Sequence, residues 1–253
     1  MTVKELYLRF SERIPEELSE EWDNDGLMCS ADSSAEVRRA LVTLDVTEEI
    51  VDYAIEQCFD LIVSHHPLIF RPIGEINEDN HTARKLIKLI ESGISVFSFH
   101  TRADKVVGGV NDLLCDLFGM YDTRMLGTDL IGRVGELDEE LSLEDFAYKV
   151  KVATGSDAVR YADGYNKVKR VAVVGGDGKD YVDAAIAAGA DTYVSGRISY
   201  NIMEEASERG INLVEAGHYY TEQPVTSLFQ SVIIKADPEI YVEIASSNNI
   251  TTI

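Results

Sequence analysis

Cysteine is scarce in this chain, which has only Cys29, Cys58 and Cys115. The three are widely spaced and form no CxxC pair, so the sequence predicts neither a disulfide framework nor a thiolate metal site. Cys58 and Cys115 fall in helix-like patterns, where we expect small core residues rather than nucleophiles. Tryptophan occurs once, and we interpret Trp22 as a core or interface anchor rather than as a platform for a substrate.

Basic residues are also few. The chain has 23 lysines and arginines against 45 aspartates and glutamates, a formal net charge of −22. This balance argues against nonspecific binding of nucleic acid, which requires basic surfaces that release counterions. It also disfavours anionic membrane surfaces. The acidic residues are dispersed, which indicates solvated faces. An anionic small substrate would need local positive charge, which a pair of metal ions could supply.

Long apolar runs are absent as well, and no segment reaches the roughly 18 residues that a membrane-spanning helix requires. The charged, amphipathic stretch MTVKELYLRFSERI lacks the apolar core of a signal peptide. The sequence therefore favours a cytoplasmic protein. With 253 residues, 45% of them hydrophobic, the chain can bury a sizeable core as one large α/β domain or as two lobes.

Strand-like apolar segments alternate with helix-like segments along most of the chain. The alternation begins at residue 37 and returns after a connector at residues 120–168. Such a pattern is typical of parallel sheets with right-handed crossovers. We therefore predict an α/β fold of two similar lobes, with mostly parallel central sheets flanked by helices. Residues 1–124 would form the first lobe, which residues 236–253 could complete, and residues 125–235 would form the second.

Histidine occurs five times, and most of these residues lie just beyond strand-like segments. His65 and His66 follow DLIVS, and His100 follows ISVFSF with Asp104 four residues later. The carboxyl ends of strands are where α/β proteins place ligand-binding groups. Adjacent histidines can serve one site only if the strand has ended, an ending that Pro67 favours. Alone the pair is weak evidence, since one of the two could be a satisfied core histidine.

His218 and Glu222 are spaced i, i+4 after the segment INLVEAG. If a helix begins near Tyr219 or Tyr220, both side chains lie on one face, and the helix N-terminus favours a carboxylate there. The alternative is a capping arrangement with an exposed glutamate. Together the strand-end residues predict a site for two metal ions, with the ligands His65, His66, Asp104, His218 and Glu222.

Three histidines and two carboxylates can hold two divalent ions only if ligands are shared, so one carboxylate should bridge. Bridged ions lie about 3.5–4 Å apart and lower the pKa of a bridging water. Imidazole and carboxylate donors suit zinc, iron or manganese and do not distinguish them. Arg71, Arg102 and Lys105 flank the motifs and could contact an anionic substrate. Ordinary pairing with the abundant acids explains these three at least as well.

Five segments carry a resemblance to a known family. They are WDNDGL, LDVTEEIVDYAIEQCFDLIVSHHPLIF, HTRADKVVGGVNDLL, RVAVVGGDGKDYVDAAIAAGADTYVSG and INLVEAGHYYTE. They resemble the NIF-three-like family of dinuclear-metal proteins, often labelled GTP cyclohydrolase I type 2 homologues. The similarity covers nearly the whole chain. It implies a two-lobe α/β subunit with the metal pair in the inter-lobe cleft, assembled as a toroidal homohexamer, a trimer of dimers.

The resemblance also implies a role for each ligand. His66 and Asp104 would hold one ion, His65 and His218 would lie on the other, and Glu222 would bridge the two.

The resemblance places His100 just outside the ligands, where it would orient one of them or transfer a proton. Two positions depart from the family pattern, because relatives often have an acidic residue and a histidine where this chain has Arg197 and Asn201. If these residues line the cleft, the preferred substrate differs from that of the relatives. Arg197 is therefore a further candidate substrate contact.

The two-metal hypothesis favours a metal-dependent hydrolase that uses metal-activated hydroxide on a nucleotide-like or other small anionic substrate. A cyclohydrolase would open a purine ring and release formate, with His100 as the candidate proton carrier. A phosphoesterase would use the same ions on a different electrophile. A non-catalytic, oligomeric metal-binding or regulatory protein is the remaining alternative, and the sequence does not choose among the three.

Overall fold

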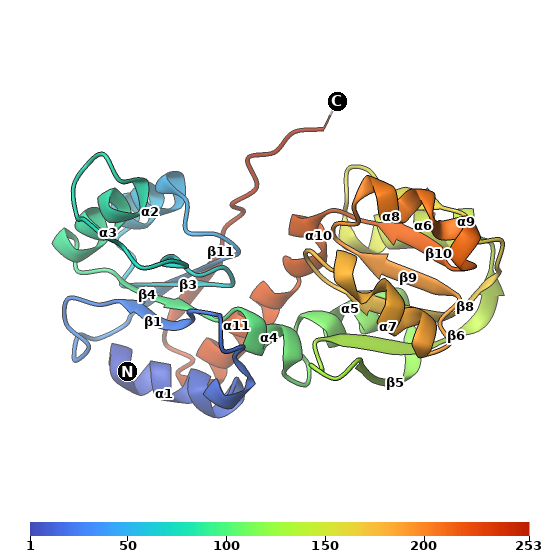
Figure 1. Ribbon diagram of the computed structural model, residues 1–253. Coiled ribbons are helices and arrows are strands. Elements are labelled where there is room, and N and C mark those ends of the chain that lie inside the picture. The colour runs from blue at the N-terminus through green and yellow to red at the C-terminus, as the bar shows by residue number, and fades with distance from the viewer. Residues whose placement is uncertain (253) are drawn as a thin grey trace. The chain divides into compact units, whose positions relative to one another are not determined.

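The computed structural model describes residues 1–252, which divide into two compact units. Unit 1 comprises Met1–Val106 and Val225–Asn249, and unit 2 comprises Val107–Pro224 with the terminal residues from Ile250. Each unit contains one β-sheet with helices packed on it (Figure 1). The α/β class with two lobes that the sequence predicts is confirmed.

The sheet of unit 1 has five strands, which are Gly26–Cys29 (β1), Arg39–Thr43 (β2), Leu61–Ser64 (β3), Ser95–Ser98 (β4) and Tyr241–Ile244 (β11). Their order across the sheet is β1-β4-β3-β2-β11. β11, β2, β3 and β4 run parallel, and β1 is antiparallel to β4 at the edge. The carboxyl ends of β2, β3 and β4 therefore meet at one edge of the sheet.

Helices cover both faces of this sheet (Figure 1). They are Val3–Arg13 (α1), Glu16–Leu18 (η1, a 3₁₀ turn), Glu48–Glu56 (α2), His81–Glu91 (α3), Thr101–Lys105 (α4) and Val225–Ala236 (α11). Thr2 caps α1 in a capping box with Glu5, and Thr47 caps α2. α2 and α3 pack on one face. On the other, α1 and α11 enclose four phenylalanines with ring centroids 4.7–6.3 Å apart: Phe10, Phe97, Phe99 and Phe229.

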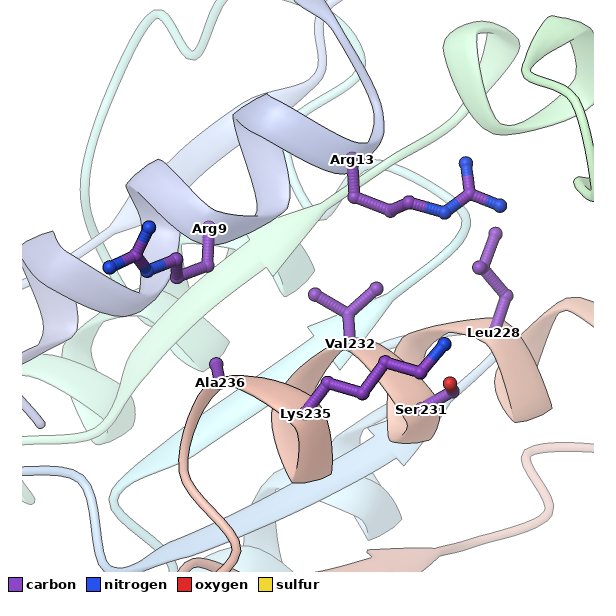
Figure 2. A pocket seen from close by; sticks show the side chains of 7 residues that line it. All are labelled: Arg9, Arg13, Leu228, Ser231, Val232, Lys235 and Ala236. Carbon is purple, nitrogen blue, oxygen red and sulfur yellow. The ribbon is translucent and has the colours of Figure 1, made fainter.

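A cavity of about 370 Å³ lies between α1 and α11 (Figure 2). Figure 2 shows the basic side chains of Arg9, Arg13 and Lys235 around the apolar side chains of Leu228 and Val232. Arg9 also forms an exposed ion pair of 3.0 Å with the residue one turn further along α1. This basic pocket contains none of the predicted metal ligands.

The sheet of unit 2 has six strands, which are Met120–Leu126 (β5), Gly132–Leu141 (β6), Arg160–Ala162 (β7), Val168–Val174 (β8), Thr192–Ser195 (β9) and Asn212–Glu215 (β10). Their order is β5-β6-β8-β9-β10-β7. Only β8, β9 and β10 run parallel to one another; the other pairs are antiparallel. This sheet is mixed, where the sequence predicted a mostly parallel one. β5 lies in the predicted connector, and its short loop to β6 can join only antiparallel strands.

The helices of unit 2 are Val110–Phe118 (α5), Leu143–Thr154 (α6), Lys179–Tyr181 (η2, a 3₁₀ turn), Val182–Ala187 (α7), Tyr200–Glu204 (α8), Ala206–Arg209 (α9) and His218–Glu222 (α10). α5 packs against β5, β6 and β8, whereas α11 packs against α1, β2 and β11. The division between the units therefore falls at Val106 and Pro224, before each of these helices. The sequence placed it after residues 124 and 235. No helix in residues 1–252 is long and apolar enough to cross a membrane.

The cysteines differ in accessibility. Cys29 and Cys115 are buried, but Cys58 is exposed at a positive φ of 54°, just past the end of α2. The expectation that Cys58 is a core residue was wrong because α2 ends before it.

We predict that iodoacetamide modifies Cys58 in the native protein far faster than the other two cysteines. Burial raises the pKa of the Cys29 thiol and raises that of Cys115 to about 12. Roughly one Cys115 side chain in ten thousand is then ionised at pH 8, and the thiolate is the reactive form. Peptide mapping after a short pulse should find one modified site, and the Cys58→Ser variant should show almost none. Equal labelling of Cys58 and Cys115 would contradict the burial of Cys115.

Candidate metal centre

His65 and His66 directly follow the end of β3. The Ser64 hydroxyl donates to the His66 carbonyl at 2.9 Å and forms a tight turn there. The two rings have centroids 5.0 Å apart, although adjacent residues on a regular strand would face opposite sides. His65 is fully buried, and the His66 side chain is 25% exposed. The strand ends where the sequence predicts, and both rings can therefore serve one site.

Three histidines of unit 1 each hold Nδ1 against an oxygen atom. The pairs are His65 with the Phe99 carbonyl at 2.9 Å, His66 with Asp45 Oδ1 at 2.7 Å, and His100 with Asp23 Oδ1 at 2.9 Å. These oxygens accept, so Nδ1 is the protonated, donating atom in each ring. In a neutral ring Nε2 then carries the lone pair that binds a metal ion. The three rings share the Nδ1 contact to an oxygen atom that is typical of metal-binding histidines.

The same three histidines converge. One ring nitrogen from each of His65, His66 and His100 lies within 4.8 Å of the others. Such a cluster of imidazole donors, oriented by oxygen acceptors, fits zinc, iron or manganese. His100 thus lies next to two predicted ligands, and its role as a proton carrier or orienting residue stays a prediction.

Asp104 lies on α4 one turn after His100, and its amide donates to the His100 carbonyl at 3.2 Å. Its Oδ1 is 3.7 Å from His65 Nε2. Asp23 fixes the start of α4, because it accepts hydrogen bonds from the Thr101 amide at 3.0 Å and the Thr101 hydroxyl at 2.7 Å. The i, i+4 spacing of His100 and Asp104 thus places a carboxylate beside His65.

Asp23 and His100 shift each other's ionisation. Burial opposes a charge on Asp23, but hydrogen bonds from His100 and Thr101 hold the pKa of Asp23 well below its usual range. Burial likewise opposes a charge on His100, yet the hydrogen bond to Asp23 and the charge of Asp104 raise the pKa of His100 above its ordinary value. His100 is therefore suited to hold a proton beside the other two imidazoles.

His218 and Glu222 form a second group, in unit 2. α10 begins at His218, after Gly217 at φ 88°, and its i, i+4 geometry places His218 Nε2 2.9 Å from Glu222 Oε2. The Glu222 side chain is only 6% exposed, whereas that of His218 is 43% exposed. The helix predicted near Tyr219 is confirmed. The exposed glutamate of the capping alternative is contradicted by the burial of Glu222.

Two glycines make room for this pair. A Cβ at Gly176, where φ is 66°, would lie 2.0 Å from Glu222 Oε1 and 3.4 Å from His218 Cε1. A Cβ at Gly196 would lie 2.8 Å from the Cα of His218. Both glycines follow the carboxyl ends of strands, β8 and β9 respectively. The turns after these strands therefore hold α10 at a distance that only glycine permits.

Arg102 does not fit its predicted role as a substrate contact. Its side chain is fully buried, its Nε donates to Asp25 Oδ2 at 3.1 Å, and its guanidinium lies 4.6 Å from the Phe99 ring centroid. The Arg102 guanidinium therefore belongs to the buried interior of unit 1, where it neutralises the Asp25 carboxylate. The sequence could not show this, because burial depends on residues distant in the chain.

The other predicted basic contacts differ among themselves. Lys105 is paired with Glu20 and only 12% exposed, which is the ordinary pairing left open by the sequence. Arg197 is 68% exposed, with Nη1 3.7 Å from Asp177. Asn201, the other departure from the family pattern, lies exposed on α8. Arg71 is exposed and lines a cavity described next.

A cavity of about 450 Å³ begins at Pro67, the residue after His66. The loop after β3 and the start of α3 line it, and its basic side chains include Arg71 and Lys85. The Lys85 ammonium donates to the Val46 carbonyl at 2.6 Å. Burial lowers the pKa of Lys85, although the charges of Asp45 and Glu48 oppose that shift. The exposed Arg71 therefore gives this cavity a positive charge.

Asp23 and Asp45 were missed by the sequence analysis. Each accepts from a histidine Nδ1, and Asp45 also accepts from the Ser247 hydroxyl at 3.1 Å. Asp45 does follow a buried strand, β2, which was the available signal. Nothing local marks Asp23 as the partner of a histidine 77 residues away.

Curated bacterial proteins are similar to this chain over most of its length. A protein of Clostridium perfringens named "GTP cyclohydrolase 1 type 2 homolog" is 36% identical over 218 residues, which cover 83% of each chain. A protein of Clostridium acetobutylicum with the same name is 33% identical over 232 residues, or 88% of this chain and 86% of the relative.

Solved structures share the fold. The Staphylococcus aureus hypothetical protein SA1388 superposes with a TM-score of 0.90 at 27% identity, over 100% of this chain and 99% of that protein. The Bacillus cereus protein related to NIF3 superposes with a TM-score of 0.88 at 24% identity, over the same shares. The family profile of Duf34/NIF3 (NGG1p interacting factor 3) matches residues 1–252. The chain therefore belongs to the Duf34/NIF3 family.

Proposed function

We propose that this chain is a dinuclear metal protein and a metal-dependent hydrolase of a nucleotide-like or other small anionic substrate. The observation that carries the proposal is the set of three clustered histidines, each with Nδ1 held by an oxygen acceptor. Metal-ligating histidines typically donate their other ring nitrogen to such an acceptor. The name "GTP cyclohydrolase 1 type 2 homolog" of the relatives supports a nucleotide substrate.

In this proposal the ligands come from both units. His66 and Asp104 would hold one ion, His65 and His218 the other, and Glu222 would bridge them from a cleft between the lobes. The support lies in the donor chemistry, because the imidazole and carboxylate groups of the predicted ligands are divided between the two units. The buried Glu222, paired with His218 and backed by Gly176, is suited to be the bridge. The toroidal homohexamer stays a prediction from the resemblance.

Two divalent ions would supply Lewis acidity for a substrate oxygen and for water. The residues of this chain would orient the ligands, transfer a proton and attract the substrate. Asp45 and Asp23 orient His66 and His100 through their Nδ1 atoms. His100 would hold a proton next to the substrate and deliver it to a leaving group. Arg71 and Lys85 would attract an anionic group into the cavity beside His66.

We expect metal-reconstituted protein to hydrolyse at least one member of a panel of purine nucleotides and phosphate esters. Formate release would identify a cyclohydrolase, and phosphate release a phosphoesterase. His100→Gln should lower the rate per bound metal ion about 10²–10⁴-fold, the usual contribution of general acid–base catalysis, with metal content measured on the same sample. Arg38→Gln, which changes a 77% exposed side chain outside both the histidine cluster and the cavity, is the control. If fully metal-loaded protein turns over nothing, the non-catalytic alternative replaces the hydrolase.

A further inference from the structure

Two large aromatic side chains remain exposed beside the histidine cluster. Trp22 is 61% exposed and Phe70 is 45% exposed. Their ring centroids lie 6.3 Å apart, and each lies 6.2–6.3 Å from the His100 ring. The three ring planes are nearly perpendicular in every pair, at 75°, 79° and 90°. They form an aromatic corner, defined here as Trp22, Phe70 and His100. Of the two roles expected for Trp22, the exposure contradicts the core anchor and leaves the interface anchor a prediction.

The segment that carries Trp22 is fixed on both sides. The Glu20 amide donates to the Thr101 hydroxyl at 3.0 Å. Asp23, whose side chain is fully buried, accepts from Thr101 and His100. An exposed indole on a tightly held backbone is unusual, because surface loops are ordinarily mobile. The fold therefore holds the solvent-exposed indole of Trp22 in a defined position. A ligand that binds it would cost less conformational entropy, because the backbone is already ordered.

A hydrogen bond also joins the segment of Trp22 to that of Phe70. The Asn24 side-chain amide donates to the carbonyl of Ile69, the residue before Phe70. Phe70 and Arg71 also line the cavity that begins beside His66. One continuous surface of unit 1 thus presents aromatic rings, a basic cavity and the histidine cluster.

We infer that the aromatic corner binds a planar heteroaromatic ring of the substrate, with Trp22 and Phe70 as the residues that determine ring specificity. This inference rests on the proposed function. Perpendicular ring planes allow a flat ligand to stack on one ring while its edge meets another, which an aliphatic group cannot exploit. The anionic part of the same ligand would then reach Arg71 in the adjoining cavity.

The test uses the intrinsic fluorescence of Trp22, which is the only tryptophan of the chain. Guanosine 5′-monophosphate and ribose 5-phosphate would be titrated separately into metal-loaded protein. The two probes share the phosphate and the sugar and differ in the ring. We expect the nucleotide to quench Trp22 emission and to bind at least 5-fold more tightly than the sugar phosphate. Equal affinity without quenching would overturn the inference.

Variants locate the contact. Trp22→Ala should weaken nucleotide binding about 5-fold to 150-fold by calorimetry, the range that stacking of one base on an aromatic side chain provides. Trp22→Phe should restore most of the affinity, and Phe70→Leu should lose part of it. Tyr148→Ala, which removes a 69% exposed aromatic ring from α6, is the control.

The metal content of each variant separates this inference from the proposed function. If the wild type holds metal and binds nucleotide, and Trp22→Ala binds it equally well, the aromatic corner is not the ring site. If Trp22→Ala instead changes only the oligomeric mass, Trp22 belongs to a protein interface and the inference fails. If neither the wild type nor any variant binds metal, the proposed function is wrong, whether or not the protein binds the nucleotide.

Discussion

His66→Ala is expected to lower the affinity of the chain for divalent metal by more than about 100-fold. Losing an orienting partner of a ligand typically costs 10–100-fold, and losing the ligand itself should cost more. Asp45→Asn, which removes the charge of the acceptor 2.7 Å from His66 Nδ1, should fall within that smaller range. Competition between the protein and a chromophoric chelator for Zn²⁺ measures both. Activity on any substrate found should fall in the same order.

The matched control is His81→Ala. His81 opens α3 and is the only histidine of the five outside the predicted ligands and His100. It should bind Zn²⁺ like the wild type. If His66→Ala keeps the wild-type affinity while its fold is intact, His66 is an oriented core histidine and not a ligand.

Arg102→Met is expected to lower the free energy of unfolding by about 3–5 kcal/mol, the usual cost of removing one partner of a buried ion pair. The substitution leaves the Asp25 carboxylate, only 3% exposed, without its cation. It also removes the guanidinium that lies over Phe99. Urea unfolding followed by circular dichroism measures the change. A substrate contact at the protein surface would have almost no effect on stability.

A double variant shows whether the loss comes from the uncompensated carboxylate. Arg102→Met combined with Asp25→Asn should be more stable than Arg102→Met alone, because no buried charge remains. Arg38→Met removes a 77% exposed arginine paired with Glu36 and should leave stability nearly unchanged. If Arg102→Met unfolds like the wild type, the structural role assigned to Arg102 is wrong.

Local features of the candidate metal centre were predictable from sequence. The end of β3 before His65, the helix from His218 and the i, i+4 placement of Glu222 each depend on a few adjacent residues. Backbone stereochemistry at Pro67 and the helical repeat determine them without help from distant parts of the chain. The strand-end position of the histidines follows from the alternation of buried strands and helices.

Features that depend on tertiary packing were not predictable. β5 is buried only at Met120 and Leu126, its two ends, so it lacks the apolar alternation that marks a strand. The burial of Arg102 and the exposure of Trp22 are decided by contacts with residues far away in sequence. The orienting role of Asp23 likewise arises only when its segment meets the start of α4.

The metal stoichiometry of the wild-type protein tests the central claim most directly. Protein stripped with a chelator would be reconstituted with Zn²⁺, Mn²⁺ or Fe²⁺, freed of excess ion and analysed by inductively coupled plasma mass spectrometry. We predict about two ions per chain with at least one of these metals. Fewer than about one ion per chain with all three would contradict the two-metal centre.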